Sequence, residues 1–404
     1  MDWNPHDWSN AVTDTCSVTA PQGFRAQGVA AGIKSTGNRD LALVVNEGPH
    51  PVSAGVFTSN RVVAAPVTLT RAHLSRATLR AIVLNSGGAN ACTGQPGAED
   101  AHTTASYVGQ VLGLDPTEVG VCSTGMIGTR LPMEALIAGI DTAAATLESS
   151  AEAGFNAADA IRTTDTVAKT YEYLDPAGWS IGGMAKGAGM LAPGLATMLC
   201  VLTTDAILPA ESATEILAEA VRTTFNRTDS DGCMSTNDSV ILLASGASGV
   251  RVDAGVFTES LRDACGALAK QLIADAEGAS HDIEIVVTNA SDEKAGEAVA
   301  RAVARSNLFK TAVFGNDPNW GRILSEVGTV PVDVAPYDPD HVNVSINGVM
   351  VCRGGGLGEP RELVDMTGRD VRIVIDLGAG NTEVTLWTND LTHDYVHENS
   401  AYSS

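Results

Sequence analysis

The feature of the sequence that most constrains the fold is the alternation of short apolar runs with longer alanine-rich stretches. Strands are indicated where Val, Ile and Leu cluster between Gly, Asn or Asp residues, at 41–45, 81–84, 119–122, 198–202, 240–243, 283–287 and 371–375. Helical spacing is found at about 98–112, 131–147, 151–162, 208–224, 257–276 and 292–308. Ser291 is a suitable N-cap for the last helix. Because residues 328–391 are mainly strand-like, we expect an α/β (α+β) fold and not one doubly wound parallel sheet.

Charge and composition exclude several classes of partner. The chain of 404 residues has a formal net charge of −23, whereas nucleic acids and anionic membranes bind basic surfaces. Its first ten residues do not resemble a signal peptide, and no apolar stretch approaches the ~18 residues of a membrane span. The seven cysteines form no CxxC pair, which favours reduced thiols. We therefore expect a cytoplasmic enzyme with small-molecule substrates.

Several familiar motifs are absent or incomplete. The sequence contains neither GxSxG nor a Gly-Lys dipeptide, so a hydrolase elbow and a Walker loop are excluded. A GxGxxA match at 187–192 is followed by Pro193, which does not continue a helix. The acidic segment 229–238 has the wrong end residues for a calcium loop, and His393 and His397 lack a third ligand. We expect no metal and no cofactor.

Three polar, glycine-rich segments stand out because each lies beside a predicted strand, at 85–92, 122–128 and 182–193. The second offers backbone N–H groups and the Thr124 hydroxyl, which can stabilise an oxyanion. The third places Lys186 in what we predict to be an otherwise uncharged loop, suited to a substrate carboxylate. Taken singly, however, such a segment is usually an ordinary tight turn, and Cys122 is expected to be a buried thiol. The residues alone therefore leave the reaction open.

Taken together and in this order, the three segments resemble the ornithine acetyltransferase family, also called glutamate N-acetyltransferase, of arginine biosynthesis. The likeness runs from about Gly23 to the last residue. Further matching pieces are found at 160–166, 231–238, 274–278, 314–322 and 398–404. The match departs from the family at Arg162 and Gly194, where other residues are usual.

The resemblance implies an autoproteolytic enzyme. It implies a layered αββα core of the autoproteolytic aminopeptidase and ornithine acetyltransferase superfamily, with a mixed α/β C-terminal portion. It also implies self-cleavage between Ala196 and Thr197, which would yield an α-chain of 1–196 and a β-chain of 197–404. The two chains are expected to interleave around one active site and to assemble as an α2β2 heterotetramer.

The resemblance also implies the site. Thr197 is the expected nucleophile, with Thr124 and Gly125 as the oxyanion hole. The expected substrate-binding residues are Thr163, Lys186, Thr197, Glu277, Asn399 and Ser404. Cleavage would give Thr197 a free α-amine, whose pKa of ~7.7–8.0 suits a general base.

The expected reaction is ping-pong transfer of an acetyl group from N2-acetyl-L-ornithine to L-glutamate through acetyl-Thr197. Some family members also use acetyl-CoA, and the motifs do not decide this second activity. Three alternatives stay open: the same chemistry in a specialised antibiotic pathway, a self-processed aminopeptidase or amidase, and an unprocessed small-molecule or nucleotide-binding module.

Overall fold

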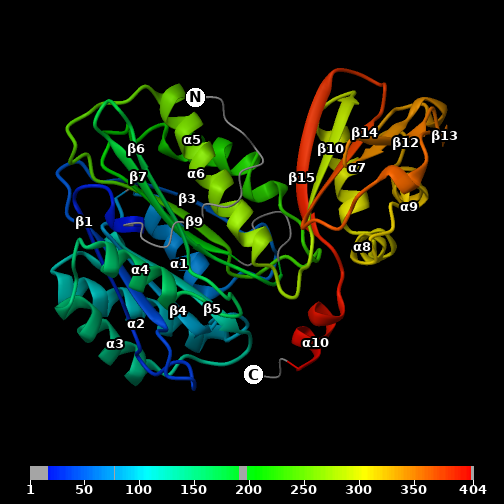
Figure 1. The fold of residues 1–404 in the computed structure, drawn as a ribbon. Coiled ribbons are helices and arrows are strands. Elements are labelled where there is room, and N and C mark those ends of the chain that lie inside the picture. The colour runs from blue at the N-terminus through cyan, green and yellow to red at the C-terminus, as the bar shows by residue number, and fades with distance from the viewer. Residues whose placement is uncertain (1–16, 77, 191–197, 402–404) are drawn as a thin grey trace.

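The core of the protein is a four-layered αββα arrangement, followed by a smaller mixed α/β portion (Figure 1). The computed structural model describes residues 17–76, 78–190 and 198–401. The fold class predicted from the resemblance is confirmed. The expected break between 196 and 197 lies outside the described residues.

The first core sheet contains four strands in the order β1-β2-β4-β5, and only β4 and β5 are parallel neighbours. The strands are β1 (Phe24–Val29), β2 (Leu41–Asn46), β4 (Ala81–Gly88) and β5 (Val119–Met126). Its outer face is covered by α2 (Gly94–Leu112) and α3 (Met133–Ala145), whose apolar stripes pack on alternate strand residues such as Leu43 and Val83. Helices α1 (Ala65–Leu74) and α4 (Ala151–Ala160) contact the two edge strands of this sheet, β5 and β1 respectively.

The second core sheet contains five strands in the order β3-β9-β8-β7-β6. The strands are β3 (Val52–Phe57), β6 (Lys169–Leu174), β7 (Ser180–Lys186), β8 (Leu199–Thr204) and β9 (Ser239–Ala244). One face packs against the first sheet, where Val44 and Leu84 meet Val201 and Ile241. The other face packs against α5 (Ala213–Arg222) and α6 (Ala254–Ala274). This sheet therefore combines strands from both sides of residues 191–197.

The C-terminal portion has its own hydrophobic core under a six-stranded mixed sheet in the order β13-β12-β11-β14-β10-β15. Its strands are β10 (Asp282–Ala290), β11 (Asn343–Ile346), β12 (Val349–Arg353), β13 (Gly356–Leu357), β14 (Asp370–Asp376) and β15 (Thr382–Asn389). Its helices are α7 (Glu293–Ala304), α8 (Asn307–Phe314) and α9 (Trp320–Val327). The last helix, α10 (His393–Ala401), leaves this portion and extends beside the core (Figure 1).

Each of the predicted strands and helices named above overlaps an observed one, but two details were wrong. The single helix expected over 292–308 is two helices, α7 and α8, separated by a break in which Ser306 caps the second. The N-cap of α7 is Asp292 and not Ser291, because the Asp292 carboxylate accepts the backbone N–H of Ala295.

Candidate active site

The two residues predicted to form the oxyanion hole lie at the end of strand β5, next to its parallel neighbour β4. Ser86 is paired with Thr124, and Gly87 with Gly125. Gly125 has a φ of +126°, and a Cβ atom there would lie 2.6 Å from the carbonyl carbon of Gly87. Only glycine fits this position, because a side chain would both strain the backbone and collide with β4. The Thr124 hydroxyl is nearly buried beside it.

Lys186 approaches Thr124 from the opposite sheet. It is the last residue of β7, so the predicted uncharged loop was wrong: Gly182 to Lys186 are buried strand residues. The Lys186 Nζ donates to the Thr124 Oγ1 at 3.2 Å. Burial lowers the pKa of Lys186, while the negative charges of Asp165, Asp238 and Glu277 partly oppose that shift. A single ammonium group is thus held against the proposed oxyanion pair.

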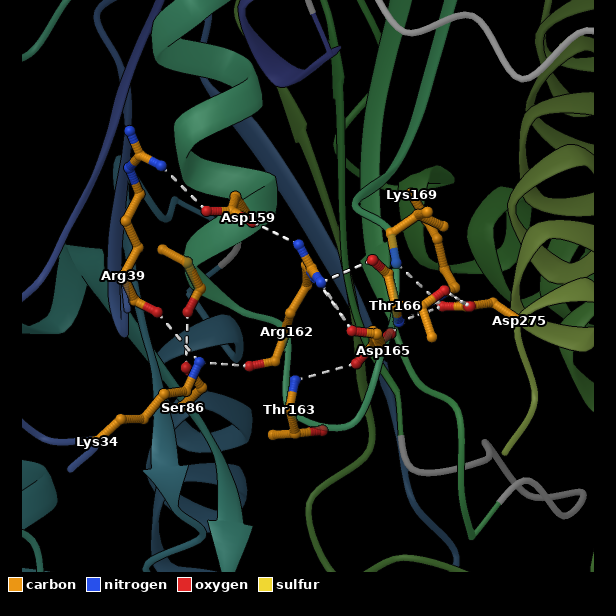
Figure 2. Close-up of polar contacts among 12 residues, drawn as sticks. Lys34, Arg39, Ser86, Asp159, Arg162, Thr163, Asp165, Thr166, Lys169 and Asp275 are labelled. Carbon is orange, nitrogen blue, oxygen red and sulfur yellow. Dashed lines mark hydrogen bonds and ion pairs between the residues drawn. The ribbon is translucent and has the colours of Figure 1, made fainter. Parts of the chain in front are cut away.

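A buried ion-pair network supports this ammonium group (Figure 2). The Lys169 Nζ lies 2.6 Å from the Asp165 Oδ1 and 2.6 Å from the Asp275 Oδ2. Asp165 also accepts the backbone N–H of Gly187 at 2.6 Å and that of Thr163 at 3.0 Å. Burial opposes ionisation of Asp165, but Lys186 and Lys169 outweigh it and hold the pKa of that carboxyl well below its usual range. One carboxylate therefore positions both Thr163 and the residue that follows Lys186.

Glu277 and Asn399 lie together, although 122 positions separate them in the sequence. The Asn399 Nδ2 donates to the Glu277 Oε2 at 2.9 Å, so α10 is folded against this carboxylate. The Glu277 backbone N–H donates to the Ala188 carbonyl at 3.0 Å, and a Cβ on Gly189 would lie 2.5 Å from the carboxylate. The backbone beyond Lys186 is therefore directly beside Glu277. Ala196, Thr197 and Ser404 lie outside the described residues.

Two further carboxylates near the site were not predicted. Asp238 is fully buried just before β9, and its Oδ1 accepts the N–H of Met198, the residue that follows Thr197 in sequence, at 3.0 Å. Asp231 accepts the N–H of Met190 at 2.7 Å. The segment 229–238 that contains both was rejected as a calcium loop, and 231–238 was used only as a piece that matches the family, without a role for either carboxylate. Asp238 could have been noticed because it comes just before a predicted strand, where active-site residues are often placed. Its contact with Met198 could not have been predicted from one sequence.

The other residues considered for metal binding do not form a site in the described part of the chain. His393 packs edge-on against Phe314, with ring centroids 5.5 Å apart. The described residues contain no group of three or more His, Cys, Asp or Glu side chains arranged to hold a metal ion. Cys122 is a buried thiol, as predicted, and burial raises its pKa to about 12. None of the described helices is both long enough and apolar enough to span a membrane.

Comparison with known proteins identifies the family. The sequence model of the ArgJ family matches residues 25–404. The chain belongs to the ArgJ family. Two curated relatives described as "arginine biosynthesis bifunctional protein ArgJ" are 58% identical over 388 residues in Streptomyces coelicolor and 56% identical over 390 residues in Bifidobacterium longum. Each alignment covers 96% of this chain and 100% of the relative.

Two solved structures are similar to part of this ArgJ-family chain. The ornithine acetyltransferase of Mycobacterium tuberculosis, complexed with ornithine, is 52% identical, with a TM-score of 0.44, 45% of this chain covered and 96% of that chain covered. The ArgJ protein of Bacillus halodurans is 36% identical, with a TM-score of 0.41 and coverages of 45% and 94%. The resemblance stated from the sequence is confirmed. The chain is an enzyme of arginine biosynthesis, an acetyltransferase of the glutamate N-acetyltransferase (ornithine acetyltransferase) type.

Proposed function

We propose that this enzyme transfers the acetyl group of N2-acetyl-L-ornithine to L-glutamate through an acetyl-Thr197 intermediate. The observation that carries the proposal is the contact between Lys186 and Thr124, which brings the two core sheets together. Strands β5 and β8 are also in contact, and the proposed nucleophile is two positions before β8. A carboxylate held by Lys186 would therefore lie close to the oxyanion donors of Thr124 and Gly125.

The enzyme first processes itself. The Thr197 hydroxyl attacks the carbonyl carbon of Ala196, the peptide C–N bond breaks, and its nitrogen takes up a proton to become the α-amine of Thr197. Water then hydrolyses the ester and releases the carboxylate of Ala196. The products are an α-chain of 1–196 and a β-chain of 197–404, which assemble as α2β2. This division is compatible with the second sheet, which combines β6 and β7 with β8 and β9.

Acetyl transfer then follows in two half-reactions. The free α-amine of Thr197 accepts the hydroxyl proton while the oxygen attacks the acetyl carbonyl, and ornithine leaves with a proton on its amine. Thr124 and Gly125 stabilise the oxyanion, which is worth about 3–4 kcal/mol per donor in such sites. Glutamate then attacks the acetyl ester with its amine and regenerates the Thr197 hydroxyl. Lys186 holds the α-carboxylate that both substrates share, and Glu277 with Asn399 binds the ornithine side-chain amine.

The remaining features of the proposal follow the family. The reaction proceeds with these side chains alone, without a metal or cofactor, in the cytoplasm. Thr163 and Ser404 complete the substrate contacts. Because the relatives are described as bifunctional, acetyl-CoA is included as a second acetyl donor to the same Thr197.

Product analysis with and without glutamate tests the transferase assignment against a self-processed aminopeptidase or amidase. We expect N-acetylglutamate and ornithine when both substrates are present, and little free acetate without glutamate. Holding the glutamate amine against the ester favours aminolysis over hydrolysis through proximity. Release of acetate at the same rate in both conditions would contradict the assignment. The Thr197→Ala variant is the control, since it should neither cleave nor transfer.

A further inference from the structure

The side chains of the two proposed substrates carry opposite charges, and Glu277 can attract only one of them. Ornithine carries an ammonium group on its side chain, whereas glutamate carries a carboxylate. The surroundings of Glu277 are already acidic, because the carboxyl groups of Asp231 and Glu398 are near enough to be affected by its charge. Burial and the negative charge of Glu277 both raise the pKa of each of these two groups. A glutamate carboxylate placed there would meet like charges in a partly desolvated setting. The acceptor side chain therefore needs another location.

A basic pocket lies beside Thr163. It has a volume of about 490 Å³, and its lining includes Lys34, Arg39, Asp159, Arg162 and Thr163. The positive charge of Lys186 lowers the pKa of Lys34, and the negative charge of Glu277 raises the pKa of Lys186. Lys186 therefore interacts electrostatically both with the pocket and with Glu277. Thr163 lines this pocket and is also one of the expected substrate-binding residues of the active site.

The cations of this pocket exceed its carboxylates (Figure 2). Asp159 is shared by two guanidinium groups: its Oδ1 lies 2.7 Å from Arg162 and its Oδ2 lies 3.1 Å from Arg39. Lys34 donates only to backbone carbonyls among the described residues, those of Arg39 at 3.1 Å and Arg162 at 2.6 Å. The lining of the pocket thus contains three cationic side chains and one carboxylate, and Asp40 is a second carboxylate whose charge acts on Lys34, in a chain whose net charge is −23.

We propose that this pocket, formed by Lys34, Arg39 and Arg162 beside Thr163, binds the side-chain carboxylate of the acceptor glutamate. A carboxylate accepts the paired donors of a guanidinium group, which gives both charge and direction to the contact. Burial lowers the pKa of Lys34, while Asp40 and Asp159 oppose that shift, and an incoming carboxylate would further stabilise the charged form. The inference rests on the proposed function, because it takes glutamate as the acceptor.

The three cations differ in how far they also serve the fold. Arg162 donates through Nε and Nη2 to the carbonyls of Asp165 and Thr166, so its replacement would disturb the loop that holds Thr163. The side chain of Arg39 is 40% exposed, and its described partner is Asp159 alone. Arg39→Gln is therefore the sharper test. Arg25→Gln is a matched control, since Arg25 also pairs with one carboxylate, that of Glu47, and does not line the pocket.

Steady-state kinetics with two acceptors tests the pocket. Wild type should prefer glutamate to glutamine, which has the same shape without the charge. Loss of one charge-assisted contact in Arg39→Gln should raise the KM for glutamate about 10-fold or more. The KM for glutamine, the KM for acetylornithine and the rate of acetyl-enzyme formation should not change, and Arg39→Lys should recover part of the loss. Arg25→Gln should behave as wild type.

Equal changes in the KM of glutamate and glutamine, or no change for glutamate, would overturn the proposal. Calorimetric titration of glutamate into wild type and Arg39→Gln, without an acetyl donor, provides a second readout that needs no turnover. Glutamate binding that is about 10-fold weaker in the variant supports the pocket even if acetyl transfer fails. Unchanged binding contradicts the pocket while leaving the transferase assignment intact. The two proposals can therefore fail separately.

Discussion

Replacement of Lys169 by methionine tests whether the buried network beneath the site stabilises the fold. The Lys169 side chain is fully buried, and its ammonium group lies 2.6 Å from a carboxylate oxygen of Asp165 and 2.6 Å from one of Asp275. Methionine preserves most of the apolar contacts of the lysine stem and removes the charge. Two carboxylates that are almost entirely buried then lose their shared counter-charge.

The expected loss of stability is large for a single substitution. Removing one partner of a buried ion pair costs about 3–5 kcal/mol, because the remaining charge stays desolvated. Lys186 and the N–H groups of Gly187 and Thr163 still act on Asp165, so we expect the lower half of that range. Arg25→Met is the control. Its pair with Glu47 is 41% and 51% exposed, and such surface pairs contribute about 0.2–1 kcal/mol.

Urea unfolding at equal protein concentration, followed by both circular dichroism and tryptophan fluorescence, gives the comparison. The pH dependence of the stability difference between wild type and Lys169→Met provides a second test. Because Lys186 and Lys169 lower the pKa of Asp165 against the effect of burial, its ionisation stabilises the fold above its unfolded pKa of ~3.9. That contribution is lost as the pH falls through the lower folded pKa. The difference between wild type and Lys169→Met should therefore be largest near neutral pH and shrink below about pH 4. A difference of less than about 1 kcal/mol at neutral pH, or one that grows in acid, would refute the reasoning.

Three further predictions concern the site itself. Thr124→Val should lower kcat about 10²–10³-fold and change KM little, because it removes a hydrogen-bond donor to the oxyanion. Initial-rate measurements test this, and an unchanged kcat would exclude that role. Gly125→Ala should lower the thermal midpoint and soluble yield more than Gly128→Ala, because both have positive φ but only Gly125 has β4 backbone 2.6 Å from the added Cβ. Glu277→Gln should raise the KM for acetylornithine about 10-fold without raising that for glutamate, and a parallel rise in both would contradict its role as the amine ligand.

The fold class could be predicted because the apolar core strands have a local signature. Strand β2 is buried along its whole length, and its first five residues, 41–45, are an unbroken apolar run. Strand β7 was missed as a strand because Gly182, Gly183 and Lys186 favour a loop when taken locally. Its backbone pairs with β6 and β8 on both sides, and the sheet overrides the local preference.

The candidate site could be predicted only in part, for a related reason. Gly125 could be singled out because it belongs to a glycine-containing segment directly after a predicted strand. The structure explains why glycine is needed there, since the backbone lies so close to β4 that a Cβ atom would collide with it. The contact of Lys186 with Thr124 joins residues 62 positions apart, and that of Asn399 with Glu277 joins residues 122 apart. No local pattern encodes such pairs. The pocket that contains Arg39 and Lys34 could likewise not be predicted, because the sequence does not show that the fold places both residues beside Thr163.

The central claim is that Thr197 becomes an N-terminal nucleophile which carries the acetyl group. Intact mass spectrometry of the purified protein, before and after addition of acetylornithine, tests it most directly. The account predicts two chains, one of which begins at Thr197 and gains the mass of one acetyl group, which glutamate then removes. A single chain of 41.6 kDa that still transfers acetyl groups, or an acetyl group carried elsewhere, would contradict it.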